Sequence, residues 1–344
     1  MKKLISLLCL IFISSFCFLI ILKPEICINS AISGVLICGN IIIPSIYPFT
    51  FGVLFINNSG VLGLLKPLNK VTNKLFGLNY YEFAIFLLSL IGGYPLGAKL
   101  LSEKPSPKND IMINFCINAG PAFIILAVGK GVFKSSALGW VLYTSHIMAS
   151  LLIMLFLSGK TKKYNTNFIN KKPLGCVENF TQSASDAANT VIKICGLVIL
   201  FSTITAYLKM LFKNIKPLYF ITLLCEVTNA VFTTKNILLI SFLLGFAGLS
   251  IWAQVFSLLK YTKINYLRFV FFRILHGCFS AFITLVLLNS LKLSVSTLSN
   301  NVSFNPKMFI NTPVVAFSLI IMGIVLIISL SNKKYAGNLI EDIV

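Results

Sequence analysis

Three glycines, a proline and a lysine interrupt one of the apolar segments of this chain. The run reads Gly92-Gly93-Tyr94-Pro95-Leu96-Gly97-Ala98-Lys99. In a bilayer every backbone N–H and C=O must be paired within the protein, so a helix breaks only where protein groups or a water-filled cavity replace the lost bonds. Such breaks form the substrate sites of secondary transporters. We therefore predict that Gly92, Gly93, Tyr94, Pro95, Gly97 and Lys99 contribute to a substrate site. The alternative, close helix packing by small residues, gives Pro95 and Lys99 no role.

Polar residues interrupt three further apolar runs. The run Asn118-Ala119-Gly120-Pro121 would free backbone groups for binding, and Glu226-Val227-Thr228-Asn229 forms a second polar cluster. Gly245-x-x-Gly248-Leu249-Ser250 is a weaker echo of the glycine-rich run. Because polar groups inside a membrane are costly, each is a functional candidate. The predicted binding residues are Asn118, Gly120, Pro121, Asn229 and Ser250.

Glu226, His146 and His276 are candidates for moving protons. Burial of a glutamate favours its neutral form, so Glu226 could couple transport to protons; an ion pair with a neighbouring lysine is the alternative. His146 and His276 are the chain's two histidines, and each is either a proton relay or a packed hydrogen-bonding group. Lys193 and Arg273 also lie at or near helix interiors, although such side chains commonly extend to the membrane surface.

The composition identifies the class of elements that must position these residues. Of 344 residues, 57% are hydrophobic and 11% are charged, whereas soluble domains carry about 25% charged residues. We therefore expect an all-α, polytopic membrane protein with about 8–10 membrane segments, some of them broken or re-entrant. The net charge of +20 predicts contact with anionic lipids in a bilayer and not with nucleic acid, because the lysines lie between apolar runs.

No pattern of catalytic or metal-binding residues accompanies this composition. The nine cysteines occur singly, mostly in apolar runs, as small buried hydrophobic residues do. No Ser-His-Asp, metal-ligand or phosphate-loop spacing occurs. We expect neither an enzyme, nor a cofactor, nor a metal site.

Lysine placement predicts the topology. The stretch 159–180 contains five lysines, and the positive-inside rule places it in the cytoplasm. If residues 82–98 enter and leave the membrane on that side, further lysines are cytoplasmic too, which favours a re-entrant element over a plain span. These are Lys66, Lys70, Lys74, Lys104 and Lys108. The apolar segments lie near residues 4–22, 31–56, 80–101, 111–130, 135–158, 186–212, 218–232, 236–259, 267–290 and 313–331.

The two halves of the chain share an ordered set of short motifs. Cys38-Gly39 with Ser45 recurs as Cys195-Gly196 with Ser202, and each histidine precedes a serine by four residues. Internal duplication is common in carriers. The predicted domains are a first transmembrane helix and short loop (1–30), a first repeat (31–158), a basic cytoplasmic linker (159–185), a second repeat (186–290), and a polar loop, last helix and tail (291–344).

Three runs of the sequence resemble the sporulation integral membrane protein family called YlbJ: residues 92–99, 114–124 and 226–229. This family is similar to nucleoside transporters and carries the nucleoside recognition, or Gate, domain. The resemblance spans about residues 31–290. It implies a transporter that moves dipicolinate from the mother cell across the outer forespore membrane of a spore-forming bacterium. It also allows a homo-oligomer or an assembly with other sporulation membrane proteins.

Two other functions remain open. In a nucleoside carrier or channel, neutral amide and aromatic groups would form most of the substrate site. A non-transporting assembly protein of the developing spore would carry no substrate at all.

Overall fold

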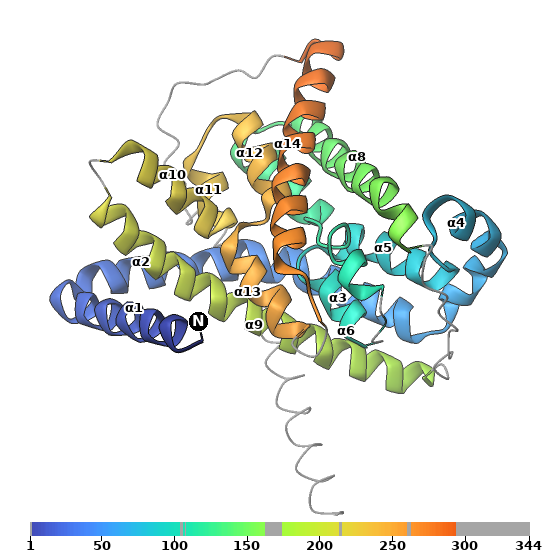
Figure 1. Ribbon diagram of the computed structural model, residues 1–344, viewed down its shortest axis with the longest axis horizontal. Coiled ribbons are helices and arrows are strands. Elements are labelled where there is room, and N and C mark those ends of the chain that lie inside the picture. The colour runs from blue at the N-terminus through green and yellow to red at the C-terminus, as the bar shows by residue number, and fades with distance from the viewer. Residues whose placement is uncertain are drawn as a thin grey trace, which may run out of the picture.

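The computed structural model describes residues 2–103, 106, 108–161, 174–212, 215–259 and 263–293. Every regular element in these ranges is helical, which confirms the predicted all-α class. The centre of the linker, the polar loop after residue 293, the last predicted helix and the tail lie outside the described residues. Figure 1 shows the arrangement, in which α9 runs along the base and α14 rises from it.

The first half of the chain alternates long helices with short ones. Its elements are α1 (Lys2–Leu22), α2 (Pro24–Ile37), the π-helical η1 (Cys38–Ile42), α3 (Ile43–Asn58), the 3₁₀-helical η2 (Val61–Leu68), α4 (Asn69–Phe76), α5 (Tyr80–Gly92), α6 (Leu96–Glu103), α7 (Asn109–Met112), the π-helical η3 (Ala122–Val132) and α8 (Ser136–Thr161).

The second half has a similar alternation. Its elements are α9 (Cys176–Leu211), α10 (Lys216–Cys225), α11 (Val227–Thr233), α12 (Ile237–Phe246), α13 (Gly248–Leu258) and α14 (Tyr266–Ser290).

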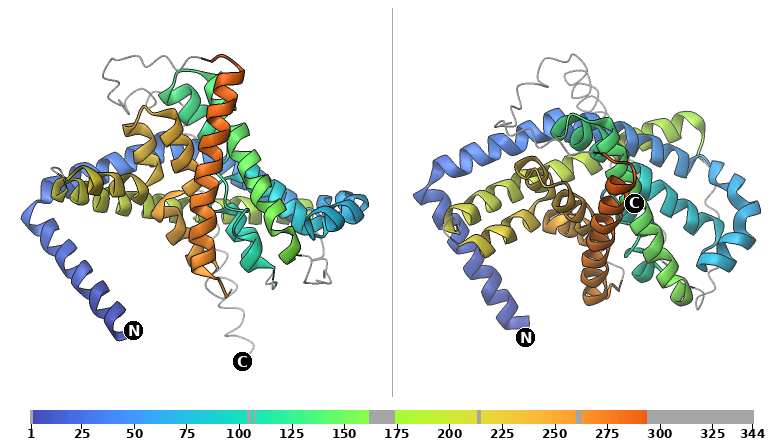
Figure 2. Two further views of the ribbon diagram at one scale, coloured as in Figure 1. Left: turned by 45° about the horizontal axis from the view of Figure 1, so that its top comes forward. Right: turned by 90° about the horizontal axis from the view of Figure 1, so that it is seen from above.

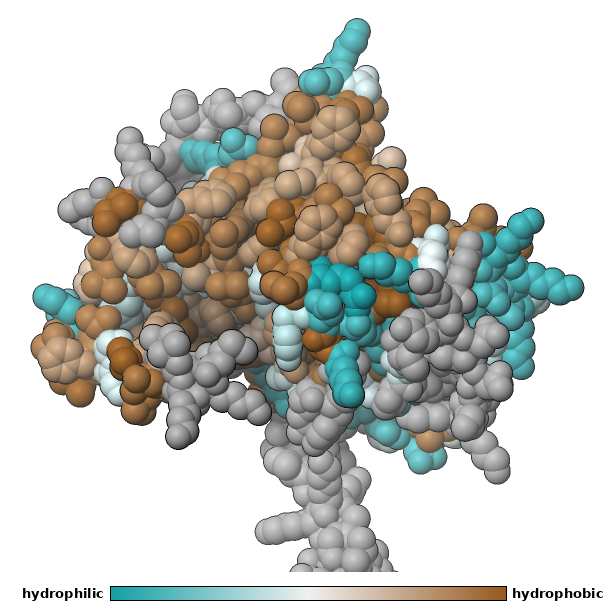
Figure 3. All heavy atoms as spheres, in the orientation of Figure 1, coloured by the Kyte–Doolittle hydropathy of each residue, from teal (hydrophilic) through white to brown (hydrophobic). Residues whose placement is uncertain are grey.

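Five helical stretches in the described part are long and apolar enough to cross a membrane, or six if a bent pair counts as one span. Their outward faces carry large apolar side chains such as Phe156, Phe271 and Phe282, each more than half exposed, as lipid contact requires. Figure 3 shows this apolar surface over α8, α12 and α14. The five stretches are Pro24–Asn58, Ser136–Thr161, Cys176–Leu211, Ile237–Leu258 and Tyr266–Ser290.

The predicted 8–10 segments cover the whole chain and include broken ones, whereas these five stretches are full-length spans among the described residues. Polar residues divide several of the other apolar runs. The run 111–130 becomes α7, a non-helical stretch at residues 113–120 (the extended stretch) and η3. The run 218–232 is divided at Glu226. Each piece is shorter than the roughly 20 residues that a helix needs to span the hydrocarbon layer.

The longest helices pack against each other in antiparallel directions. Gly34 faces Ile199 near one end, and the Asn179 Nδ2 donates to the Phe55 carbonyl at 3.0 Å near the other. Between them the Cys38 Sγ lies 3.7 Å from the Cys195 carbonyl oxygen. Residue numbers thus rise along α2–α3 as they fall along α9. Figure 2 shows α1 projecting away from this body.

The chain turns back on itself between α5 and α6. A Cβ on Gly97 would lie 3.0 Å from that of Ser89. Gly97 in α6 therefore packs against Ser89 in α5, and each lies four positions from Gly93. At the other end, Lys108 forms an ion pair with Glu82, with 2.9 Å between Nζ and Oε2. The resulting helical hairpin has its tip at Gly93–Pro95, as the predicted re-entrant element requires; its side of the membrane stays a prediction.

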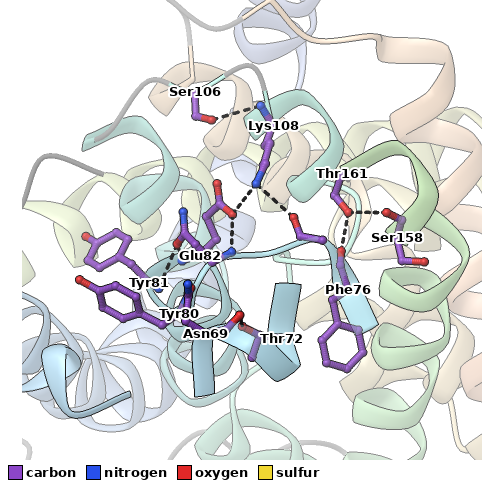
Figure 4. Close-up of polar contacts among 12 residues, drawn as sticks. Asn69, Thr72, Phe76, Tyr80, Tyr81, Glu82, Ser106, Lys108, Ser158 and Thr161 are labelled. Atoms are coloured by element: carbon purple, nitrogen blue, oxygen red, sulfur yellow. Dashed lines mark hydrogen bonds and ion pairs between the residues drawn. The ribbon is translucent and has the colours of Figure 1, made fainter. Parts of the chain in front are cut away.

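A capping box fixes the start of the hairpin. The Asn79 side chain accepts hydrogen bonds from the N–H groups of Tyr81 and Glu82 at 3.0 and 2.9 Å. The Glu82 carboxylate accepts in return from the Asn79 N–H at 2.8 Å. This exchange satisfies orphan donors of the first helical turn. Figure 4 shows Glu82 lying between that turn and Lys108.

Candidate functional site

Four breaks in the helices meet at one cavity. They are the hairpin tip before α6, the extended stretch before η3, the turn between α10 and α11, and the turn between α12 and α13. The centre of a water-sized sphere can occupy about 40 Å³ of the cavity, and the surrounding 460 Å³ of space between protein atoms includes space open to the outside. Its lining residues are Ile42, Ile46, Gly93, Tyr94, Gly120, Phe123, Ile194, Val198, Glu226, Val227, Thr228, Ser250, Ile251 and Gln254.

Two of the breaks touch through their glycines. A Cβ on Gly93 would lie 3.0 Å from the Gly120 nitrogen, and one on Gly120 would lie 3.2 Å from the Gly93 Cα. Gly93 has φ 76° and ψ −176°, a conformation that is essentially restricted to glycine. Glycine is therefore required here both by the backbone angles and by the close approach, which explains the Gly-Gly and Gly-Pro signals of the sequence.

Glu226 forms the third break and is 1% exposed. Its carboxylate accepts hydrogen bonds from the N–H groups of Thr228 at 3.0 Å and Asn229 at 2.5 Å, and so caps α11. The Asn229 side chain in turn donates to the Ser202 hydroxyl on α9 at 2.8 Å. The Lys209 ammonium on α9 attracts the Glu226 carboxylate electrostatically. The alternative of an ion pair with a neighbouring lysine therefore stays a prediction.

Ser250 lies in the first turn of α13 and faces the cavity. Its hydroxyl is buried and has no hydrogen-bond partner among the described residues. Buried polar groups are usually satisfied by protein, water or ligand. Ser250, with Thr228 and Gln254, gives the cavity neutral polar groups, whereas Ile42, Ile46, Ile194 and Val198 give it apolar walls.

Three helices begin at the cavity. Gly93 and Tyr94 directly precede α6, Gly120 closely precedes η3, and Ser250 lies at the start of α13. The partial positive charge of these three N-termini favours an anion. The C-termini of α5 and α10 and the Glu226 carboxylate, which lie at the same breaks, act against one.

Several of the predicted binding residues lie outside the cavity lining. The Lys99 Nζ approaches the Asp186 carbonyl oxygen and the Thr190 hydroxyl on α9, at 3.4 and 3.3 Å. Asn118 donates to the Ser89 hydroxyl and the Phe115 carbonyl at 3.0 and 2.9 Å, and so fixes the extended stretch. The remaining residues outside the lining are Gly92, Pro95, Gly97, Pro121 and Asn229.

The two histidine rings pack against each other in the core, tilted by 34°. Their ring centroids are 4.4 Å apart, and both side chains are fully buried. The His146 Nε2 accepts from the Ala119 N–H at 3.0 Å, and the His276 Nε2 lies 3.1 Å from the His146 carbonyl oxygen. His146 therefore holds the extended stretch before η3, outside the cavity lining, and the proton relay stays a prediction.

Residues that the sequence motifs made equivalent also meet in space. Cys38 contacts Cys195, and the His146 ring packs against the His276 ring. An approximate two-fold axis between the halves would bring such equivalent positions together, as in transporters with repeated halves. The domain boundaries themselves stay a prediction.

Arg273 has a larger structural role than the sequence motifs indicated. It is fully buried and donates to the carbonyls of Ile117 at 2.6 Å, Asn114 at 2.5 Å and Gly245 at 3.4 Å. It thus joins the extended stretch of the first half to the end of α12. The available signal was an arginine inside an apolar segment.

The chain is similar to one named protein over most of its length. It is 22% identical over 328 residues to the sporulation integral membrane protein YlbJ of Bacillus subtilis (strain 168), and the match covers 78% of this chain and 79% of that protein. No protein-family model matches the chain. No solved structure matches it significantly.

Proposed function

We propose that this membrane protein acts in sporulation as a carrier of a small anionic metabolite, bound in the cavity where the four helix breaks meet. The observation that carries the proposal is the convergence of three helix N-termini on a cavity with an unpartnered hydroxyl, that of Ser250. Broken helices persist in a bilayer where they line such a cavity, and transporters use these helix ends to bind anionic groups.

Dipicolinate is the proposed metabolite. Its two carboxylates suit the helix N-termini, and its planar ring suits the cavity walls, which include Tyr94 and Phe123. The similarity to the sporulation protein YlbJ supports a role in the developing spore. The proposed location is the outer forespore membrane, with transport out of the mother cell.

A nucleoside carrier is the second candidate. Thr228, Ser250 and Gln254 are neutral hydrogen-bonding groups, and the lining contains neither lysine nor arginine. These groups suit a neutral, polar ligand as well as an anion. Uptake measurements with both kinds of substrate must therefore distinguish the two candidates.

The test is uptake by proteoliposomes that contain the full chain alone, with labelled dipicolinate and labelled uridine in parallel. We expect dipicolinate uptake, and we expect Ser250→Ala to reduce it about tenfold or more, because a hydrogen bond to a charged group contributes about 1.5–3 kcal/mol. Ser145→Ala is the matched control. Ser145 is also fully buried, but its hydroxyl bonds to the Val141 carbonyl of its own helix at 2.8 Å.

Each outcome of this experiment has a distinct meaning. Uridine uptake without dipicolinate uptake would favour the nucleoside carrier. Uptake of neither by protein that is folded and correctly inserted would contradict transport and favour the assembly protein. Equal losses in Ser250→Ala and Ser145→Ala would place the substrate site elsewhere.

Glu226 is the proposed proton-coupling group. It is the carboxylate that lines the cavity, and a bound anion beside it favours its protonated form because like charges repel strongly where water is excluded. An anion would then move together with a proton. Glu226→Gln should therefore abolish the dependence of flux on pH while some flux remains.

The measurement is initial uptake over a series of external pH values. Glu178→Gln is the control, because Glu178 is exposed at the start of α9. An unchanged pH profile in Glu226→Gln would rule out this role. Partial loss of the cap on α11 affects the amplitude of uptake and not the shape of the profile, which is why the profile is the readout.

A further inference from the structure

The segment Val61–Phe76, formed by η2 and α4, lies across the direction of the hairpin. Its axis is bent by 84° from that of α5. A hairpin that enters the membrane along the membrane normal therefore places this segment in the plane of the membrane surface. In Figure 1, α4 lies at the periphery of the molecule, beside α5.

Three faces run along this segment. One packs on the protein through the buried Leu62 and Thr72. A second carries the exposed Lys70 and Lys74, which lie about one helical turn apart on α4, and the exposed Lys66 in the preceding η2. Figure 3 shows hydrophilic side chains gathered at the side of the molecule where α4 lies. The third face is apolar yet exposed, and it carries Leu64 (78% exposed), Leu68 (43%), Val71 (53%) and Leu75 (51%).

The charge of the segment is of a single sign. Residues 61–76 contain no aspartate or glutamate, and the nearby Glu82 carboxylate is paired with Lys108. Asn69, Lys70, Asn73 and Lys74 line an open hollow on this surface, which offers amide and ammonium donors to one acceptor group. A phosphate is the acceptor that this arrangement suits.

Packing places the end of the segment beside the end of α8. The Thr161 hydroxyl at the end of α8 donates to the Phe76 carbonyl at the end of α4, and the Lys108 Nζ donates to the Gly77 carbonyl at 3.1 Å. The lysine-rich stretch that follows Thr161 is predicted to be cytoplasmic. The cytoplasmic leaflet carries the anionic lipids of the membrane.

We propose that Val61–Phe76 is an interfacial helix that binds anionic phospholipid. Leu64, Leu68, Val71 and Leu75 lie at the boundary between head groups and acyl chains, and Lys66, Lys70 and Lys74 bind the lipid phosphates. A one-sided apolar face beside a lysine-rich face is the pattern of helices that lie in the membrane interface. Because this segment leads directly into α5, bound lipid would also fix the base of the hairpin.

The first test measures lipid binding by the purified full chain in a neutral detergent. Phosphatidylglycerol should raise its thermal unfolding temperature at much lower concentration than phosphatidylcholine, since a ligand that binds only the folded state stabilises it. The variant Lys66→Gln/Lys70→Gln/Lys74→Gln should need on the order of a hundredfold more phosphatidylglycerol, because each lysine near an anionic surface contributes about fivefold. Added salt should reduce the preference in the wild-type protein.

The matched control removes the same charge elsewhere, as Lys130→Gln/Lys134→Gln/Lys292→Gln, from three exposed lysines on other elements. It should respond to phosphatidylglycerol as the wild-type protein does. Equal loss in both triple variants would reduce the effect to net charge and overturn the proposal. An equal response of the wild-type protein to the two lipids would also overturn the proposal. This face would then be assigned to contact with a protein partner.

The second test measures the depth of the apolar face in proteoliposomes. In Leu75→Trp the added tryptophan fluorescence should be quenched by phosphatidylcholine brominated near the head-group end of its acyl chains and protected from iodide in the water. Leu75 is exposed, so the larger side chain is accommodated without repacking the core. Strong quenching by iodide with none by brominated lipid would place this face in water and contradict the proposal.

Discussion

Loss of one charge from the Glu82–Lys108 pair is expected to destabilise the protein by about 3–5 kcal/mol, because the partner is left as an uncompensated buried charge. Both side chains are 4% exposed. In Glu82→Gln the Lys108 ammonium keeps the Gly77 carbonyl but loses its carboxylate. In Lys108→Met the carboxylate keeps only neutral donors, such as the Asn79 N–H.

The double variant Glu82→Gln/Lys108→Met should cost much less than the sum of the two single changes. It removes both charges, and a buried ion pair replaced by neutral groups is often close to neutral in stability. The measurement is a double-mutant cycle on the free energy of unfolding of the full chain in detergent. If the two side chains form an ion pair, the cycle should give a large coupling free energy between the two positions.

Asp110→Asn supplies the control for this cycle. Asp110 pairs with Arg268, but these side chains are 28% and 19% exposed, so the loss should stay within about 1 kcal/mol. If Glu82→Gln costs no more than Asp110→Asn, the pair does not close the hairpin in the way the geometry indicates. Uptake measured on the same variants would show whether the base of the hairpin also matters for transport.

The helix breaks were predictable because their signals are local. Gly93 needs a conformation that glycine adopts, and Glu226 is a charged residue inside an apolar run, which marks a polar site in a membrane protein. Such preferences act within a few residues, so a sequence pattern reports them. The turn at Ala247–Gly248, where both residues have positive φ, was predicted less distinctly, because alanine is not a residue type that signals such a turn.

The lining of the cavity was predictable only in part because packing between distant segments decides it. Lys99 follows a helix break, which is the position expected of an anion-binding residue, yet its ammonium faces α9. Ile42 and Val198, which form the walls, have no distinguishing sequence context. The motif repeats, in contrast, predicted equivalence of Cys38 with Cys195, and their contact follows from the antiparallel packing of the helices that carry them.

Arg273→Met is expected to cost about 3 kcal/mol or more and to loosen the contact between the two halves. The change leaves the carbonyls of Asn114, Ile117 and Gly245 without their donor, and an unsatisfied buried carbonyl costs about 1–3 kcal/mol. Relief of the buried charge offsets part of this loss. The net effect is unfavourable because one guanidinium serves three acceptors.

The variant Arg273→Lys separates charge from geometry. Lysine keeps the positive charge, but its compact ammonium cannot present the planar fork with which arginine reaches acceptors on two separate segments. Its stability should therefore lie between those of the wild-type protein and Arg273→Met. Thermal unfolding in detergent measures the order of the three, and Arg268→Met, which changes the chain's other arginine at a partly exposed site, is the control.

The order of these variants decides what holds the two halves together at the cavity. If Arg273→Met were as stable as the wild-type protein, the three carbonyls would have found other donors, and the breaks would be fixed by packing alone. If Arg273→Lys were fully stable, charge would suffice and the planar geometry would be unimportant. The expected order instead makes Arg273 the group that sets the extended stretch before η3 against the end of α12. Any movement of one half against the other during transport must then break or carry those hydrogen bonds, so reduced uptake in a stable Arg273→Lys protein would identify this contact as part of the transport cycle.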